Sequence, residues 1–173
     1  WSLHYLAEIN SNKGQYTKAE ILHKRSLAIR EKKFGLDHTH VVTTLTSLAK
    51  LYKIQRMYVK AEPLFQRILK INEKLHGKDD PEVGFSLHNL AENYIFQGWH
   101  SKAEPLYKRC LEIFEKYFGP DHNFVALILP LLSEIYEMQG RYKEALILLK
   151  RSLKITKKLF GSNSQQYVHG LIS

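Results

Sequence analysis

The stretch Ser101–His122, "SKAEPLYKRCLEIFEKYFGPDH", decides the fold of this chain, because its last five residues recur in altered form. Related endings occupy 34–38 (FGLDH), 76–80 (HGKDD) and 160–164 (FGSNS). Each ending holds a glycine, and successive glycines lie 42 residues apart: Gly35, Gly77, Gly119 and Gly161. A fixed period of this length predicts an array of structural repeats in which each unit packs on its neighbours.

Six further positions keep one residue type in all four copies of the repeat. Five of the six are apolar, which is the pattern expected of core positions. In the first copy they are Leu6, Ala19, Leu22, Arg25, Leu27 and Ile29, and their counterparts follow at steps of 42. We therefore place the repeat units at about 1–37, 38–79, 80–121 and 122–163, with a partial helix over 164–173.

The apolar spacing within one unit is helical. From Ala103, apolar side chains follow at +3, +4, +7 and +8 as far as Leu111, the stripe of a 3.6-residue period. A similar stripe begins at Leu87, and a break at 97–99 separates the two. Each unit is therefore predicted to be a helix-turn-helix. The first helices are expected over 1–13, 38–55, 80–97 and 122–139, and the second helices over 16–34, 58–76, 100–118 and 141–160.

The linker between units combines a helix stop with a helix start. Its glycine closes the second helix in a left-handed conformation without side-chain strain. The last turn of each second helix carries a lysine, which interacts favourably with the negative end of the helix dipole: Lys32, Lys74, Lys116 and Lys158. The residues two positions after each glycine are predicted to cap the next helix: Asp37, Asp79, Asp121 and Asn163. His38 and His122 beside them are interpreted as cap-region residues rather than metal ligands.

Three motifs add to this pattern: "LAKLY" at 48–52, "LAENY" at 90–94 and "YVKAEPLF" at 58–65. Together with the stretch quoted above, they resemble tetratricopeptide repeats of the long, 42-residue kind. Repeats of this length are similar to those of kinesin light chains and nephrocystin-3. Similar arrays occur in bacterial proteins fused to nucleotide-binding switch modules or peptidases. The resemblance covers essentially the whole chain.

This resemblance implies an all-α fold, a right-handed α-solenoid of stacked antiparallel helix pairs, forming a single domain over 1–173. It also implies that the first helices line a concave groove that takes up extended or helical peptides. Helix packing alone supports a stack, since a single pair cannot bury its apolar face. Because the chain starts and stops inside repeat units, we expect further repeats or domains in the full-length protein. The family and the single cysteine lead us to expect a cytoplasmic protein.

Composition and motifs exclude several functions. The chain is 44% hydrophobic and 25% charged, and no apolar run approaches the roughly 18 residues of a membrane span. Metalloprotease, phosphate-loop, nucleophile-elbow and CxxC motifs are missing, so we expect no enzyme activity, no cofactor and no metal site. Cys110 shares its column with Ser26 and is expected to be a buried structural thiol. His4 and His88 share a column but lie two repeats apart, roughly 20 Å by helix packing, too far for one metal.

The expected groove residues follow from column and helical face. They are first-helix positions outside the Leu-Ala-Tyr core: Thr43, Thr46, Ser47, Lys50, Lys53, Phe85, His88, Asn89, Glu92, Leu127, Leu131 and Glu134. Kinesin light chain repeats commonly carry two asparagines before Leu-Ala, and Asn89 alone matches that pair. We expect Asn89 to hold a peptide backbone, and Lys50 and Lys53 to attract an acidic segment. Phe85 and Leu127 are expected to act as apolar anchors.

Pro130 falls near the middle of the fourth first helix. A proline there removes a backbone donor and clashes with the preceding turn, at a cost of about 3 kcal/mol. The helix is therefore predicted either to kink at Pro130 or to begin its regular part late. We hypothesise that a kink widens the groove beside Phe85 and Leu127.

The net charge of +9 is unevenly distributed along the chain. The second helices sum to +13 and the first helices to −3. The strongest basic cluster is the outer basic patch, Lys150, Arg151, Lys154, Lys157 and Lys158. Aromatic residues do not interleave with these lysines as stacking on bases requires. Membrane-surface binding is not expected either, because the apolar stripe opposite the charge is used for helix stacking.

Two function classes remain. The first is a protein–protein interaction scaffold that binds a peptide or partner helix, with an acidic segment, in the groove of the first helices. The alternative is an electrostatic scaffold that binds nucleic acid or an acidic protein through its basic outer helices. Binding of nucleic acid would weaken steeply with salt, whereas groove binding would depend on a few side chains. A structural spacer between other domains is a third hypothesis.

Overall fold

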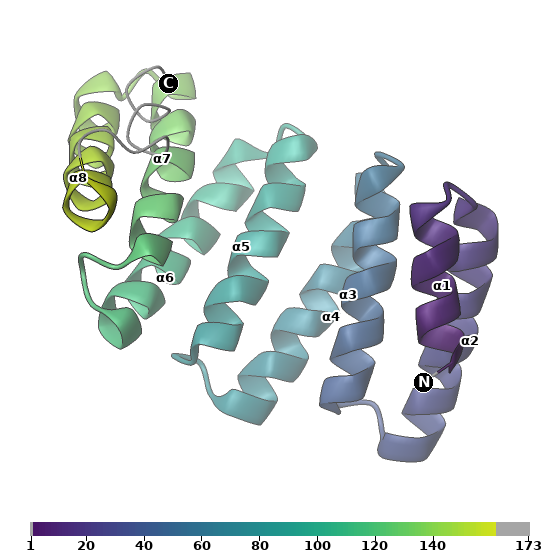
Figure 1. Ribbon diagram of the computed structural model, residues 1–173. Coiled ribbons are helices and arrows are strands. Elements are labelled where there is room, and N and C mark those ends of the chain that lie inside the picture. Colours follow the sequence, from purple (N-terminus) through teal and green to yellow (C-terminus); the bar gives the residue numbers. More distant parts are fainter. Residues whose placement is uncertain (1, 162–173) are drawn as a thin grey trace. The chain divides into compact units, whose positions relative to one another are not determined.

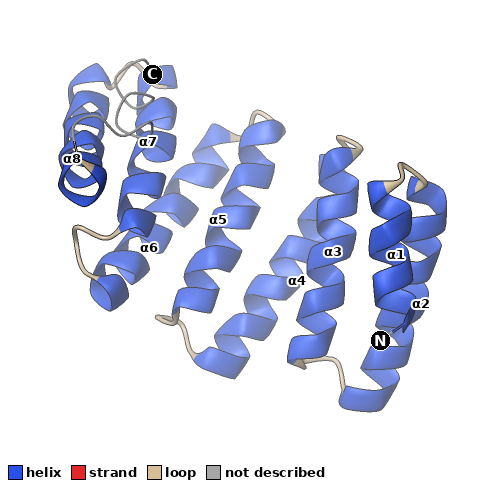
Figure 2. Ribbon diagram, in the orientation of Figure 1, coloured by secondary structure: helices blue, strands red, loops and turns tan. Residues whose placement is uncertain are grey.

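Residues 2–161 are described by the computed structural model, and they form eight α-helices without a β-strand (Figure 1). Figure 2 shows how short the connecting turns are. The helices are α1 (Ser2–Asn12), α2 (Tyr16–Phe34), α3 (Thr39–Ile54), α4 (Tyr58–His76), α5 (Pro81–Phe96), α6 (His100–Phe118), α7 (Asn123–Met138) and α8 (Tyr142–Phe160). Each helix lies inside its predicted range, so the helix-turn-helix prediction is confirmed. The partial helix expected over 164–173 lies outside the described residues.

The chain forms two compact units, Trp1–Trp99 (unit 1) and His100–Ser173 (unit 2). In unit 1, α1, α3 and α5 lie side by side, with α2 and α4 behind them (Figure 1). Ala19 on α2 and Ala61 on α4 are completely buried, as expected for a small residue where two helices approach closely. Leu45 and Leu87 fill the layer between the first and second helices and have no exposed surface.

The first repeat buries its core columns less completely than the second. Leu6 and Ile29 are 47% and 49% exposed, whereas their counterparts Leu48 and Ile71 are 2% exposed. The prediction that both columns are core positions is therefore wrong for the first repeat. Burial in these columns needs a preceding helix pair, and the described residues contain none before α1.

Unit 2 contains α6, α7 and α8 among its described residues. Its core holds Tyr107 and Phe114 from α6, Ile128 from α7 and Ile155 from α8, each at most 3% exposed. Cys110 is completely buried, which confirms that it occupies a structural core position.

The linker histidines are the N-caps of the helices that follow them. His38 Nδ1 accepts from His40 N at 3.1 Å, and His122 Nδ1 accepts from Phe124 N at 3.2 Å. The prediction that Asp37, Asp79 and Asp121 cap these helices is wrong, because the cap is the next residue in each linker: His38, Asp80 and His122. Asn163, the fourth predicted cap, lies outside the described residues.

Arginine and lysine from the recurring columns hold the linker after α2 to α4 and the linker after α6 to α8. Arg67 Nη1 pairs with Glu31 Oε1 at 2.6 Å, and Arg67 Nη2 donates to Leu36 O at 3.3 Å. Lys74 pairs with Asp37. Unit 2 repeats these contacts: Arg151 Nη1 to Glu115 Oε1 at 2.5 Å, Arg151 Nη2 to Pro120 O at 3.2 Å, and Lys158 Nζ to Asp121 Oδ2 at 2.6 Å. These aspartates thus bind lysines instead of capping helices.

The described residues with a positive φ are seven glycines and one arginine, Arg56. Gly35 ends α2 with a φ of 87°, and its N–H donates to Glu31 O at 2.9 Å, as expected for a glycine at a helix end. Within the helix pairs, the turn after α3 places Arg56 at a φ of 57°, where the other turns have glycine. An L-residue adopts this conformation only with strain.

The helix α7 continues through Pro130 without interruption. The alternative that this helix begins late is therefore wrong. Pro130 has no N–H to donate to Ala126 O, and that carbonyl accepts a hydrogen bond from Ser152 Oγ of α8 at 2.9 Å. The neighbouring helix thus supplies a substitute for the bond that proline removes, which offsets part of its cost.

Candidate binding surface

The predicted groove residues of α3 lie on one side of that helix. Thr43 and Lys50 are exposed, and Thr46 and Ser47 are half-buried. Thr43 Oγ1 donates to Thr39 O at 3.0 Å, and Thr46 Oγ1 donates to Val42 O at 2.9 Å. These hydroxyl protons are therefore bound to their own helix, which leaves the exposed ammonium of Lys50 as the strongest donor that α3 offers a ligand here.

The predicted groove residues of α5 are Phe85, His88, Asn89 and Glu92, and all four are half-buried. Asn89 Nδ2 donates to Phe85 O at 2.9 Å, one turn earlier on the same helix. An amide also carries a carbonyl oxygen with two lone pairs, so Asn89 can still accept from a peptide N–H. The amide nitrogen also keeps a second hydrogen, so Asn89 retains a donor as well as an acceptor for a peptide backbone.

One ion pair joins the two helices across this surface. Lys53 Nζ of α3 binds Glu92 Oε2 of α5, and it also lies 5.5 Å from the ring centre of Phe96. Lys53 was expected to attract an acidic segment of a ligand, but the structure pairs it with Glu92 of the neighbouring first helix. The charge of Lys53 is therefore already compensated, and Lys50 is the cation that remains exposed on this side of α3.

We call the surface made by the predicted groove residues of α3 and α5 the first-helix face of unit 1: Thr43, Thr46, Ser47, Lys50, Lys53, Phe85, His88, Asn89 and Glu92. Burial lowers the pKa of His88; Lys53 acts in the same direction, and Glu92 opposes both. The ring of His88 is therefore neutral near pH 7. The face combines a cation, an ion pair, an amide and an aromatic ring.

The remaining predicted groove residues lie on α7 in unit 2. Leu127 is 53% exposed, Glu134 is exposed and Leu131 is half-buried. Because Leu127 and Phe85 belong to different units, their use as a pair of anchors stays a prediction. The same holds for a wider groove beside Pro130.

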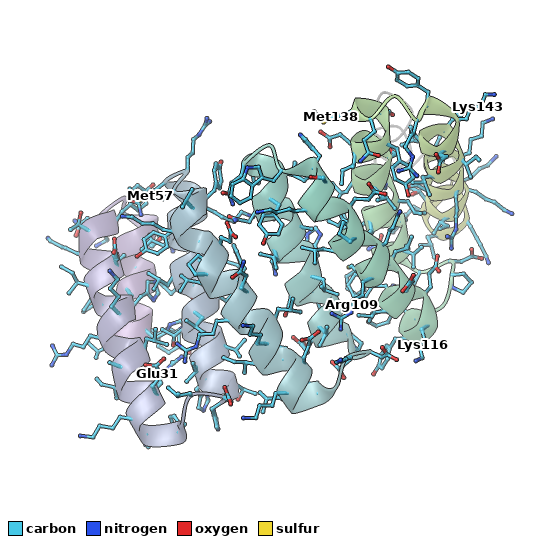
Figure 3. The ribbon with its side chains drawn as sticks, turned by 180° about the vertical axis from the view of Figure 1, so that it is seen from behind. Glu31, Met57, Arg109, Lys116, Met138 and Lys143 are labelled. Atoms are coloured by element: carbon cyan, nitrogen blue, oxygen red, sulfur yellow. The ribbon has the colours of Figure 1, made fainter. Side chains whose placement is uncertain are left out.

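The outer basic patch lies on α8, and the lysine side chains of this helix extend from it in Figure 3, where Lys143 is labelled. Lys150, Lys154 and Lys157 are exposed. The other two members are already paired with carboxylates: Arg151 with Glu115 of α6, and Lys158 with Asp121 of the linker. The patch thus offers three uncompensated cations rather than five within the part of the chain that the structure describes.

Glu104 on α6 is the centre of a second polar cluster in unit 2. It accepts from Gln139 Nε2 at 2.8 Å and binds Lys108 Nζ at 2.6 Å and Arg141 Nη1 at 3.1 Å. The hydrogen bond from Gln139 and those from the two cations lower the pKa of the Glu104 carboxyl to about 2. This cluster joins the turn after α7 to α6.

The sequence did not reveal one cluster of titratable side chains. His4 and Glu8 of α1 lie beside His23 of α2, and one nitrogen or oxygen of each lies within 4.8 Å of the others. Burial is the main cause that lowers the pKa of both His4 and His23. The column comparison paired His4 only with His88. The available signal was His23 itself, which stands where later repeats have Phe65, Tyr107 and Leu149.

None of the described helices is both long and apolar enough to span a membrane. The arrangement of capped helix pairs with a fixed period, together with mixed side chains on the first helices, defines a helical-repeat protein. A family model described as tetratricopeptide repeat matches residues 1–74, 51–116 and 83–158. The chain belongs to the tetratricopeptide repeat family, and the expected all-α solenoid of stacked helix pairs is confirmed as its fold class.

Several solved structures share this fold. A single-residue variant of a putative kinesin light chain with nearly identical TPR-like repeats, from Podosopora anserina, is 24% identical over 98% of this chain and 80% of that chain, with a TM-score of 0.84. BtubC (BKLC) from P. vanneervenii is 23% identical over 98% and 68%, with a TM-score of 0.83. The apo form of RapI is 22% identical over 96% and 44%, with a TM-score of 0.79. No curated protein matches the chain.

Proposed function

We propose that this chain binds a peptide or partner helix through the first-helix face of unit 1. A tetratricopeptide repeat fold is a protein–protein interaction scaffold, and such scaffolds generally have no enzyme activity. Kinesin light chain-like proteins are among the structures with this fold. The choice of surface is ours, and it rests on the side chains of α3 and α5.

The observation that carries the proposal is the chemistry of this face. Exposed Lys50 offers a cation, Asn89 an amide oxygen and half-buried Phe85 an apolar ring. None of the three belongs to the buried core. An acidic segment of the partner would pair with Lys50, and its backbone N–H would donate to Asn89. A preformed helical surface lowers the ordering cost of binding, since only the peptide loses freedom.

A second candidate surface is supported by a different observation. Lys150, Lys154 and Lys157 of α8 are exposed and form no ion pair with a described residue. Such a row of cations suits nucleic acid or an acidic protein. The nucleic-acid form of this candidate predicts that the logarithm of the affinity falls linearly with the logarithm of the salt concentration.

The test is selection of peptides from a random display library, followed by fluorescence anisotropy with the selected sequences. We expect acidic peptides whose affinity falls at least tenfold, about 1.4 kcal/mol, in Lys50→Glu/Asn89→Ala. Lys154→Glu is the matched control, because it makes the same change of charge on the outer face and should leave affinity unchanged. Loss of binding in Lys154→Glu alone would reject the first-helix face and transfer the function to α8.

A single-stranded DNA oligonucleotide at two salt concentrations completes the test. Binding that is weak at both concentrations supports the first proposal. Tight, salt-sensitive binding that Lys154→Glu reduces supports the alternative. Cytoplasmic location and the presence of further repeats in the full-length protein stay predictions.

A further inference from the structure

The first repeat places three metal-ligating side chains on facing surfaces of one helix pair. His4 and Glu8 are four residues apart on α1, so they project from the same side of that helix. His23 projects from α2, the antiparallel partner of α1. One potential ligand atom from each side chain lies within 4.8 Å of the other two. Two neighbouring positions on one helix and a third on its partner thus converge on one point.

The two histidines carry nitrogens that the protein does not use. His23 is only 1% exposed, and its Nδ1 has no hydrogen-bond partner among the described residues. The Nδ1 of His4 is also buried and likewise lacks a partner in the described part of the chain. Buried polar atoms are nearly always satisfied in folded proteins, so these two atoms, on rings whose centroids lie 5.8 Å apart, require an explanation.

We propose that His4, Glu8 and His23 bind one divalent transition-metal ion, with Zn²⁺ as the ion to test. Imidazole and carboxylate together suit zinc, which accepts two histidines and one glutamate and keeps a fourth position for water. Zinc–ligand bonds of about 2.0–2.2 Å place tetrahedral ligand atoms roughly 3.3 Å apart. The ligand atoms lie within 4.8 Å of one another, so the three side chains need to close in by at most about 1.5 Å on binding.

The charge around the cluster is compatible with a cation. Glu8 supplies a negative charge, and both histidines bind as neutral rings. Arg30 is the positive group that acts on both histidines. Its Nη1 donates to His40 O at 2.8 Å and to Thr44 Oγ1 at 2.6 Å, so its guanidinium is held against α3.

The repeat itself provides an internal control. The columns of His4 and Glu8 recur in the third repeat as His88 and Glu92, again four residues apart on one helix. The column of His23, however, holds aromatic or aliphatic residues in the later repeats: Phe65, Tyr107 and Leu149. Only the first repeat has all three ligands, so only the first repeat is expected to bind the ion.

The experiment is isothermal titration of the chelator-treated chain with ZnCl₂. We expect one ion per chain in the wild type. His4→Gln and Glu8→Gln should each weaken binding at least about a hundredfold, because loss of even a supporting partner of a ligand typically costs about 10–100-fold. His88→Gln, the matched control in the equivalent column, should bind as the wild type does. Circular dichroism at 222 nm establishes that each variant is folded, and neither His4 nor Glu8 belongs to the buried core.

Two further readouts keep the proposal open to refutation. Binding of Co²⁺ should give the visible absorption of a tetrahedral site, and saturating Zn²⁺ should raise the melting temperature of the wild type but not of His4→Gln. Equal Zn²⁺ affinity in the wild type and His4→Gln would overturn the proposal. Weakening by His88→Gln equal to that by His4→Gln would also overturn it, because binding would then not depend on the first-repeat trio.

Discussion

The linker between α2 and α3 in unit 1 and the linker between α6 and α7 in unit 2 have the same outer structure. In unit 1 the ring of Phe34 stacks on His38, with centroids 4.8 Å apart and an interplanar angle of 25°. In unit 2 Phe118 stacks on His122 at 4.6 Å and 18°. Both histidines cap the next helix, and both linkers are held by an arginine and a lysine from the following second helix.

The two linkers differ in the side chain that the preceding second helix places next to them. Unit 1 has Arg30, which hydrogen-bonds to Thr44 and to the His40 carbonyl. The same column in unit 2 holds Phe114, which contacts the rings of Phe118 and Phe124 at 5.8 and 5.5 Å. The linker geometry is therefore set by the cap and the ion pairs, whereas the space below accepts either a hydrogen-bonded cation or an aromatic cluster.

The largest effect on stability is expected from removing the ring of Phe114, which packs against the aromatic residues of the unit 2 linker. Phe114 is 1% exposed, so Phe114→Ala removes a buried ring and leaves a cavity. We expect it to lower the free energy of unfolding by about 3–5 kcal/mol, measured by urea denaturation. Phe114→Leu, which keeps much of the volume, should cost clearly less. An equal loss in both variants would show that volume is not what Phe114 supplies.

The hydrogen bonds of Arg30 next to the unit 1 linker should contribute less to the free energy of unfolding. Arg30→Met keeps most of the side-chain length but leaves Thr44 Oγ1 and the His40 carbonyl without their charged donor. We expect a loss of about 1.5–3 kcal/mol in the same urea measurement. A Thr44→Val/Arg30→Met double variant should lose less than the two single variants together, because both remove one shared hydrogen bond. Additive losses would contradict that coupling.

The shared caps should contribute a smaller amount. His122→Ala removes the acceptor for Phe124 N and the stack on Phe118, and we expect a loss of about 1 kcal/mol. His122→Asp should recover most of it, because Asp80 caps α5 with its own carboxylate, which accepts from Glu82 N at 2.9 Å. If His122→Asp were as destabilised as His122→Ala, stacking rather than capping would be the main contribution of the histidine.

The smallest effect concerns the opposite end of the unit 2 helices and depends on pH. The folded-state pKa of Glu104 is about 2, below its ordinary value of 4.5. Its contribution is therefore present above pH 4.5 and is lost as the pH falls toward 2. We expect the stability difference between the wild type and Glu104→Gln to be on the order of 1 kcal/mol at neutral pH. Thermal denaturation at several pH values should show it shrink on acidification; a constant difference would exclude the carboxylate as its source.

Much of the fold could be predicted from the sequence because most positions of the repeat occur in four copies that can be compared. Apolar columns located each helix, and the glycines located their ends. The capping residue was misplaced by one position, since Asp37 and His38 are both suitable caps and only the backbone direction at the linker decides between them. The exposure of Leu6 could not be read from its column either, because burial depends on the neighbouring repeat.

The candidate sites were less predictable because they depend on contacts between helices. Column and helical face placed Lys50, Lys53 and Glu92 on the first helices, but the pairing of Lys53 with Glu92 depends on how α3 and α5 lie side by side. His4 and His23 are 19 positions apart and lie on two helices, so a comparison at steps of 42 could not bring them together. Periodicity predicts which positions are alike, but not which side chains meet.

The linker ion pairs have a consequence for how the number of repeats can change in evolution. Each of them joins a carboxylate to a cation 36 or 37 positions later, so each connects one repeat to the next and none of them skips a repeat. A recombination event that duplicates or deletes 42 codons therefore leaves each remaining repeat with both sets of residues: the cations that bind the preceding repeat and the carboxylates that bind the following one. The number of repeats can change in a single genetic step, while the chemistry that joins one copy to the next is passed on intact.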